Sequence, residues 1–316
     1  VAIIAHVDHG KTTLVDELLK QSERKNTHEL IQEHAMDSND IERERGITIL
    51  AKNTAIEYKG YRINILDTPG HADFGGEVER IMNMVDAVVL VVDAYEGAMP
   101  QTRFVLKKAL EAKLKPIVVI NKIDRAFARP LEAVNEVLDL FIELNADESQ
   151  LGFPIVYTSG IKGLASYDHE FKDAKSVVPL LDTIIKYVPA PAQEKDKPLQ
   201  FQPALLDYND YVGRIGIGKI YQGTIKVNQN VSCLRLDGTI KPFRVQKLFS
   251  FLGLTRIEVE EAYAGDIVAI AGLTDINVGE TVCEQGQEIA LPILHIDEPT
   301  VQMTFGTNTS PFAGKE

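Results

Sequence analysis

Long apolar runs are missing from this sequence. No stretch approaches the ~20 residues that a membrane-spanning helix needs, and no secretory signal is visible at the start. We therefore expect a soluble, cytoplasmic protein with no membrane partner.

Basic residues and cysteines are also few. Lys and Arg number 33 against 46 Asp and Glu, a net charge of -13, which argues against a general nucleic-acid-coating surface and against DNA as a partner. An acidic protein can still dock on RNA locally. The two cysteines, Cys233 and Cys283, have no C-x-x-C spacing and no nearby histidine cluster, which fits reduced thiols in a cytosolic protein. We assign them no chemistry.

What is present is ordinary globular composition in a chain too long for one typical domain. Hydrophobic residues make up 45% and charged residues 25% of the 316 residues, so we expect two or more compact cores. The chain opens at Val1 inside an expected strand and stops at Glu316, which leads us to expect a fragment of a longer protein. A monomer is the default expectation.

The first part of the chain alternates strand and helix patterns. The apolar run at 1–5 reads as a strand, and those at 87–92 and 117–120 read as buried parallel strands. Residues 54–58 with 61–66 read as a hairpin around Lys59-Gly60. Helical patterns cover the segment after residue 10 and residues 101–112, 131–144 and 177–187. This order predicts an α/β fold, a phosphate-loop domain with a mainly parallel sheet.

The pattern changes after a proline-framed charged stretch. We expect a first domain over 1–190, a linker over 191–198, and a β-barrel over 199–297 built from short alternating segments. A further strand at 301–305 predicts that 298–316 begins a truncated third domain of the α+β type.

The loop after the first strand matches a phosphate-binding loop, with Ala5 where glycine is usual. In such a loop, backbone N–H groups and a helix N-terminus cradle phosphates, the lysine neutralises charge, and the threonine hydroxyl binds Mg²⁺. The alternative is a glycine turn with a chance lysine. The predicted nucleotide-binding residues here are Asp8, His9, Gly10, Lys11, Thr12 and Thr13, with Thr12 also a metal ligand.

A second loop selects the base. Asn121-Lys122-Ile123-Asp124 follows an apolar strand, where loops at the carboxyl edge of a parallel sheet line a ligand crevice. The Asp124 carboxylate can accept two hydrogen bonds from guanine N1–H and its exocyclic amine, a pattern that adenine does not offer. The alternative is a solvated loop with ordinary charges.

A third loop, Asp67-Thr68-Pro69-Gly70-His71, ends another strand. Asp67 suits a metal ligand, through water, and the Gly70 N–H suits a γ-phosphate sensor. His71 is placed to orient or stabilise the attacking water, although a lone histidine is more often structural. We predict His71 as the catalytic residue.

The polar loop over 22–48 closes with Arg43-Glu44-Arg45-Gly46-Ile47-Thr48. Thr48 could offer a hydroxyl to Mg²⁺ only when the γ-phosphate orders the segment, which would make the loop a switch. The alternative is a charged surface loop that enters a strand.

Together these four motifs, over 5–13, 45–49, 67–73 and 121–124, resemble those of translational GTPases, the class of elongation factors Tu and G. Within that class the segments at 36–40, 70–80 and 206–209 are most similar to the BipA/TypA family. The resemblance covers essentially the whole chain.

The resemblance implies GTP or GDP with Mg²⁺, a nucleotide domain, a translation-factor β-barrel and further domains, and it implies ribosome association at the factor-binding site. It also implies that ribosomal RNA triggers catalysis at His71 and that Asp8 helps to hold a monovalent cation. Tyr157-Thr158-Ser159-Gly160 corresponds to the last guanine-contacting loop, with Gly160 in place of the usual alanine. Ser159 and Gly160 thus join the predicted nucleotide contacts.

The leading hypothesis is a ribosome-associated GTPase that couples nucleotide state to ribosome binding in translation or in ribosome assembly under stress. The alternatives are a LepA-like or elongation-factor-G-like factor, a GTP-gated binding module with incidental hydrolysis, and an ATP-dependent enzyme on the same phosphate loop, which the motif at 121–124 disfavours.

Overall fold

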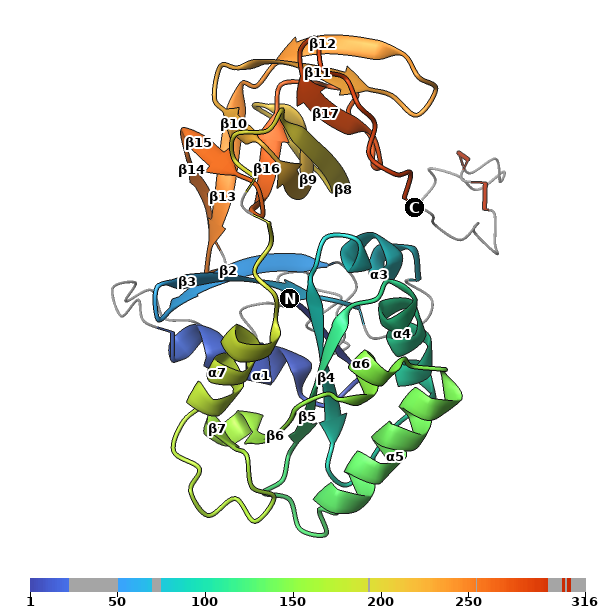
Figure 1. Ribbon diagram of the computed structural model, residues 1–316, viewed down its shortest axis with the longest axis vertical. Coiled ribbons are helices and arrows are strands. Elements are labelled where there is room, and N and C mark those ends of the chain that lie inside the picture. The colour runs from blue at the N-terminus through green and yellow to red at the C-terminus, as the bar shows by residue number, and fades with distance from the viewer. Residues whose placement is uncertain are drawn as a thin grey trace, which may run out of the picture.

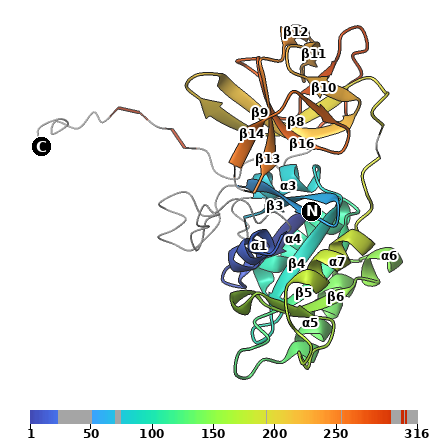
Figure 2. The same ribbon diagram turned by 90° about the vertical axis from the view of Figure 1, so that its left-hand side faces the viewer.

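The computed structural model describes residues 1–22, 51–69, 75–192, 194–253, 255–294, 303–304 and 306–307. These residues form an α/β unit followed by an all-β unit, which lie one above the other in both views (Figures 1 and 2). The predicted strand at 301–305 falls largely outside the described residues, and the domain boundaries at 190 and 198 stay a prediction.

The α/β unit is built on a seven-stranded sheet in the order β2-β3-β1-β4-β5-β6-β7. The five strands from β3 to β6 pair in parallel, and β2 and β7 join antiparallel at the two edges. The strands are β1 (Ala2–Ala5), β2 (Lys52–Tyr58), β3 (Tyr61–Asp67), β4 (Ala87–Asp93), β5 (Lys115–Asn121), β6 (Ile155–Ser159) and β7 (Leu164–Ser166). The mainly parallel sheet and the hairpin that the sequence predicted are confirmed.

Helices cover both faces of this sheet, which explains why β1 and β4 are apolar and buried along their whole length. Two helices pack on one face with Leu18 and Leu181, and three pack on the other with Ile81, Leu106 and Phe141. They are α1 (Lys11–Lys20) and α7 (Val178–Tyr187) on the first face, and α3 (Gly75–Met82), α4 (Pro100–Glu111) and α5 (Pro130–Glu143) on the second.

Three of these helices lie within a residue or two of the ranges that the sequence predicted. Pro100 and Pro130 occupy the first turns of α4 and α5, where the missing N–H costs no intrahelical bond. The sequence did not predict α3, the short α6 (Glu148–Leu151), β6 or β7, because none of them has a long hydrophobic period. It placed Tyr157, Thr158 and Ser159 in a loop, whereas they form the end of β6.

The all-β unit has an antiparallel sheet of eight strands in the order β12-β11-β17-β8-β9-β16-β13-β14, and a small β10-β15 pair. One apolar core that includes Phe201, Ile220 and Val268 fills its interior, as the predicted barrel requires. The strands are β8 (Gln200–Asn209), β9 (Gly213–Gln222), β10 (Thr224–Lys226), β11 (Asn230–Leu234), β12 (Ile240–Arg244), β13 (Lys247–Leu252), β14 (Thr255–Glu258), β15 (Glu261–Tyr263), β16 (Ile267–Ala271) and β17 (Thr281–Glu284).

Polar contacts fasten the two units together. Arg62 of β3 donates hydrogen bonds to the Ser250 hydroxyl and, at 2.6 Å, to the Phe251 carbonyl of β13. At a second contact between the units, the Lys219 ammonium of β9 lies 2.8 Å from the carboxylate of Asp86, the residue before β4. The barrel is therefore tied both to the edge hairpin and to the start of β4.

Candidate nucleotide site

The phosphate loop connects β1 to α1 and turns sharply at Gly10. Gly10 has a φ of 88°, in the left-handed region, and a Cβ there would lie 2.5 Å from Nδ2 of Asn121. Only glycine fits both conditions. No described side chain caps the first turn of α1. Its N–H groups are thus available to an anion, which is how helix N-termini bind phosphate.

Lys11 and Asp67 form an ion pair in the floor of this loop, and their side chains are 8% and 0% exposed. They meet because β1 and β3 are neighbouring parallel strands, with Ile3 opposite Asp67 in the register. The Thr68 hydroxyl also donates to the Ile3 carbonyl, at 2.6 Å, which fixes the chain just beyond β3. The pairing places the predicted phosphate cation beside the predicted metal ligand.

Asn121 joins three loops at the same sheet edge. Its Nδ2 donates to the His9 carbonyl at 2.9 Å, and its Oδ1 accepts from the Thr158 hydroxyl at 3.0 Å and from the Gly160 N–H at 2.9 Å. Asn121 itself is 1% exposed. The side chain therefore acts as an internal brace between the loops that were predicted to hold phosphate and base.

Lys122 reaches back over the phosphate loop. Its ammonium donates to the Asp8 carbonyl and lies 2.8 Å from Oδ2 of Asp93. Both Lys122 and Asp8 have positive φ values, 60° and 64°, which turn their backbones sharply enough to meet. The sequence predicted Lys122 and Asp8 as nucleotide contacts, and the structure places them in contact with each other.

Asp124 lies at the rim of the site with an ionised carboxyl. Partial burial raises the pKa of Asp124, but the nearby Ser159 side chain and Lys162 ammonium outweigh burial and lower this pKa below its ordinary value. The Lys162 ammonium is 3.5 Å from Oδ2 of Asp124. A carboxylate in this state accepts hydrogen bonds, which is the chemistry that recognition of guanine needs.

Gly160, where an alanine was expected by resemblance, is not forced by lack of space. A Cβ at this position would meet the Asn121 amide at 3.4 Å and the Leu14 backbone nitrogen at 3.5 Å, which are ordinary contacts. Its backbone N–H is already held by Asn121. An alanine would therefore fit at this position without moving its neighbours.

His9 points away from the space above the loop. Its ring is fully buried, Nε2 lies 3.1 Å from Oε2 of Glu96, and Nδ1 accepts from the Asp93 N–H at 3.2 Å. Burial, and then His6, lower the pKa of His9 more than Glu96 and Asp93 raise it. Only the backbone of His9 faces the predicted phosphate position.

Asp93 and Glu96 were missed by the sequence reasoning. Asp93 ends β4, just as Asp67 ends β3 and Asn121 ends β5. The rule that polar residues at the carboxyl ends of parallel strands converge would have selected Asp93. Glu96 lies three residues further, in a turn, and has no comparable sequence signal.

The remaining predicted residues divide into two groups. Thr12 and Thr13 are half-buried in the first turn of α1. Thr48, Gly70 and His71 lie outside the described residues.

The donor set fits Mg²⁺ bound together with a nucleotide. The Thr12 hydroxyl and the Asp67 carboxylate are hard oxygen ligands at the phosphate loop. Among the described residues no group of three His, Cys, Asp or Glu is placed to hold a metal alone. The ion would therefore depend on phosphate oxygens and water, as Mg²⁺ in nucleotide sites commonly does.

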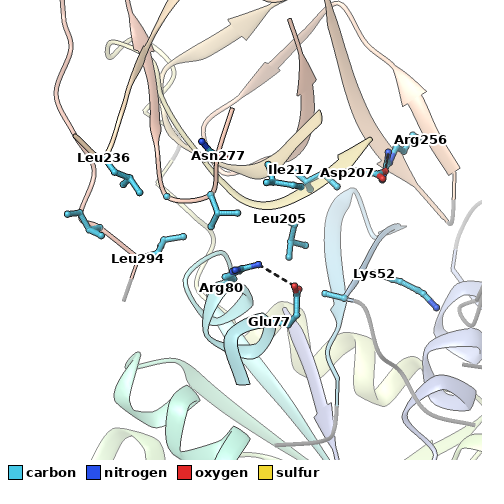
Figure 3. A pocket seen from close by; sticks show the side chains of 15 residues that line it. Lys52, Glu77, Arg80, Leu205, Asp207, Ile217, Leu236, Arg256, Asn277 and Leu294 are labelled. Atoms are coloured by element: carbon cyan, nitrogen blue, oxygen red, sulfur yellow. Dashed lines mark hydrogen bonds and ion pairs between the residues drawn. The ribbon is translucent and has the colours of Figure 1, made fainter. Parts of the chain in front are cut away.

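A separate cavity of about 700 Å³ lies between α3 and the barrel, and none of the predicted site residues lines it. Figure 3 shows Glu77 and Arg80 of α3 facing Leu205 and Ile217 of the barrel across this space. Burial raises the pKa of Glu77 despite the nearby Arg80 guanidinium. This cavity belongs to the junction between the units and not to the nucleotide site.

Neither cysteine forms a reactive site. Both cysteines are buried in the barrel, and burial, with Glu280 close by, raises the pKa of the Cys233 thiol to about 12. Such a thiol stays protonated and unreactive at neutral pH. No helix in the described ranges has the length and apolarity to cross a membrane.

Family models and solved structures agree with this architecture. Residues 1–190 match the elongation factor Tu GTP binding domain and residues 213–283 match elongation factor Tu domain 2. Two solved structures each cover 90% of this chain: a bacterial selenocysteine-specific elongation factor EF-Sec (24% identity, 44% of that chain, TM-score 0.65) and elongation factor SelB from Methanococcus maripaludis (23%, 54%, TM-score 0.64). At these identities the likeness shows the fold alone.

Curated relatives match along the whole of this chain. Each is called large ribosomal subunit assembly factor BipA: the Bacillus subtilis protein is 68% identical over 52% of its length, the Escherichia coli K12 protein 58% over 52%, and the Synechocystis protein 58% over 53%. The chain therefore spans about half the length of the curated relatives it matches. These matches favour the predicted BipA/TypA resemblance over the LepA-like and elongation-factor-G-like alternatives. The chain belongs to the translational GTPases of the elongation factor Tu class, and within that class it is of the BipA/TypA type.

Proposed function

We propose that this chain is the nucleotide-binding and barrel portion of a GTPase that binds GTP with Mg²⁺, hydrolyses it to GDP and phosphate, and acts on the ribosome. The observation that supports this most directly is the meeting of four chain segments at one sheet edge. Lys11 pairs with Asp67, and Asn121 braces both the phosphate loop and the loop at Gly160.

Each residue in this arrangement has a proposed role. Backbone N–H groups over 8–13 and the Lys11 ammonium bind the β- and γ-phosphates, and Asp124 with the backbone at Ser159 and Gly160 reads guanine. Thr12 and Asp67 hold Mg²⁺, joined by Thr48 once the γ-phosphate orders its segment. When bound, the ion neutralises charge that develops on the phosphate oxygens. Gly70 senses the γ-phosphate, and His71 orients the attacking water.

Lys11 changes partner when nucleotide binds. In the structure its ammonium faces the Asp67 carboxylate. A triphosphate carries more negative charge than one carboxylate, so phosphate oxygens draw the ammonium away from Asp67. Asp67 then serves the metal through water, and Asp8, itself a residue of the loop, contributes to a monovalent cation site.

The partner is the ribosome, with ribosomal RNA contacted locally because the net charge of -13 opposes a broad RNA-binding surface. The relatives named as assembly factors for the large ribosomal subunit support this choice. Hydrolysis is slow in the free protein and accelerated on the ribosome, since complete stabilisation of the transition state needs an added partner. The protein acts in the cytoplasm as a monomer.

Measured turnover tests the proposal. GTP hydrolysis by the full-length protein is followed with and without 70S ribosomes, for the natural chain and for His71→Ala. We expect stimulation by ribosomes that His71→Ala abolishes while affinity for GTP stays normal. Stimulated hydrolysis that survives in His71→Ala contradicts the catalytic role. Ribosome binding that depends on GTP without any hydrolysis supports the alternative of a nucleotide-gated binding module.

The guanine-reading role has its own test. Asp124→Asn is expected to shift preference from GTP toward xanthosine triphosphate, because the amide donates where the carboxylate accepted. A competition assay with ATP, GTP and xanthosine triphosphate measures this preference. Unchanged selectivity for GTP refutes the assignment, and equal competition by ATP in the natural chain supports an ATP-dependent enzyme.

A further inference from the structure

The histidine that precedes Gly10 is wedged between two elements of the sheet edge. His9 is 0% exposed, and its ring centroid lies 5.0 Å from that of His6 in an edge-on arrangement. Its ring nitrogens contact the end of β4 and the turn after it, at Asp93 and Glu96. A buried imidazole with a partner on each nitrogen is a fixed element of the loop.

The two contacts determine the protonation of the ring. The Asp93 backbone N–H donates to Nδ1, so Nδ1 carries no proton. Nε2 then carries the proton and donates it to the Glu96 carboxylate at 3.1 Å. A doubly protonated ring would set an N–H of Nδ1 against the N–H of Asp93. These two contacts favour the neutral ring with the proton on Nε2, and burial, which lowers the pKa of His9, favours the same state.

The two partners of the His9 ring, Asp93 and the turn that carries Glu96, are themselves held in place by other side chains. The Asp93 carboxylate is fully buried and pairs with Lys122 at 2.8 Å and with Arg125 at 3.3 Å. Arg129 donates to the Tyr95 carbonyl at 2.9 Å and to the Glu96 carbonyl at 3.3 Å. The turn after β4 is thus anchored from the loop that carries the guanine-reading motif.

Side chains therefore bond the phosphate loop to two neighbouring segments, the loop after β5 and the end of β4 with its following turn. Asn121 holds the His9 carbonyl, and Lys122 holds the Asp8 carbonyl. The His9 ring supplies the only described side-chain bonds that run from the phosphate loop to the turn after β4. Loss of this ring removes the described side-chain bonds from the phosphate loop to the end of β4 and the turn after it, while the bonds from Asn121 and Lys122 and the Lys11–Asp67 pair remain.

We propose that His9 is a positioning residue that sets the phosphate loop in its nucleotide-binding geometry by bonding Asp93 and Glu96, an inference that rests on the proposed nucleotide binding. His9 does not touch the nucleotide with its side chain. It fixes the backbone N–H groups on either side of Gly10, which act on the phosphates.

The dissociation rate of N-methylanthraniloyl-GDP from the full chain tests this role. His9→Leu removes both ring bonds, and we expect dissociation to accelerate about 10- to 100-fold, the range that one or two hydrogen bonds to a charged or buried group represent. His9→Asn keeps an acceptor near Nδ1 and His9→Gln keeps a donor near Nε2. Each is expected to restore part of the loss.

Glu96→Ala is the second variant, because it leaves the buried ring in place and changes a side chain that is 38% exposed. Combined with His9→Leu it should add little, since both remove the same bond. His169→Leu is the matched control at a half-exposed histidine. Thermal melting followed by circular dichroism reports the fold of each variant.

Each outcome decides the question. Dissociation that stays within twofold in both His9→Leu and Glu96→Ala overturns the proposal. Fully additive losses in the double variant, with no restoration by Asn or Gln, show a general packing role and overturn it as well. A natural chain that fails to bind the labelled GDP at all refutes the proposed nucleotide function instead, so the two failures are distinguishable.

Discussion

Replacing Asn121 by alanine is expected to weaken the nucleotide unit more than any exposed asparagine would. The side chain is buried and makes three hydrogen bonds to two segments, one to His9 in the phosphate loop and two to Thr158 and Gly160 around the end of β6. Alanine removes the common partner and leaves a carbonyl, a hydroxyl and an N–H without it. Only the hydroxyl can rotate to seek another partner.

The magnitude follows from what is left unpaired. A buried polar group that loses its partner costs about 1–3 kcal/mol, and three such groups set an upper bound of about 9 kcal/mol. Water entering the space of the lost amide restores part of this. We therefore expect a loss of about 3–5 kcal/mol, a large fraction of the roughly 5–15 kcal/mol that stabilises a typical protein.

Urea unfolding measures this loss. The chain has no tryptophan, so far-ultraviolet circular dichroism with tyrosine fluorescence is the suitable signal. Asn83→Ala is the matched control, because Asn83 is exposed and its amide makes one hydrogen bond, to the Glu79 carbonyl at 2.8 Å. A change of less than about 1 kcal/mol in Asn121→Ala, or one equal to the control, refutes the idea that this side chain braces the site.

Two other predictions concern acid stability and the junction between the units. Burial raises the pKa of Asp93, but hydrogen bonds from Lys122 and the Tyr95 N–H lower this pKa by more. The contribution of Asp93 to stability is therefore complete above the ordinary pKa of 3.8 and is lost as pH falls below that value. At acid pH, the unfolding free energy of Asp93→Asn should therefore fall less steeply with decreasing pH than that of the natural chain. An unchanged slope contradicts this account. Arg62→Ala removes two hydrogen bonds to the barrel and should let the two units unfold in separate transitions. Calorimetry measures this, with the exposed Arg103→Ala as control, and a single transition as in the control argues against Arg62 as a fastener.

The fold was largely predictable because its signals are local. The apolar runs of β1, β4 and β5 are buried on both faces, and their length and composition announce this without any tertiary information. Three predicted helices and the hairpin also agree with the structure within a few residues. In contrast, α3 has only eight residues, too few for a hydrophobic period to stand out.

The nucleotide site was predictable only in part. The motifs indicate which residue types gather at the sheet edge, and the positions of the strand ends explain why Lys11, Asp67 and Asn121 meet there. Which of them touch each other is not written in the motifs. His9 shows the difference, since its place in a phosphate loop suggests contact with nucleotide and its ring instead faces Glu96.

The sequence by itself determined the family, the alternation of strands and helices, and the chemistry available at four loops, because each depends on residues close together in the chain. Tertiary structure decided which groups pair, which ring nitrogen of His9 carries a proton, and that Arg62 and Lys219 fasten the barrel to the nucleotide unit. Those outcomes depend on distances between segments far apart in the chain, which only the packed sheet brings to bonding range.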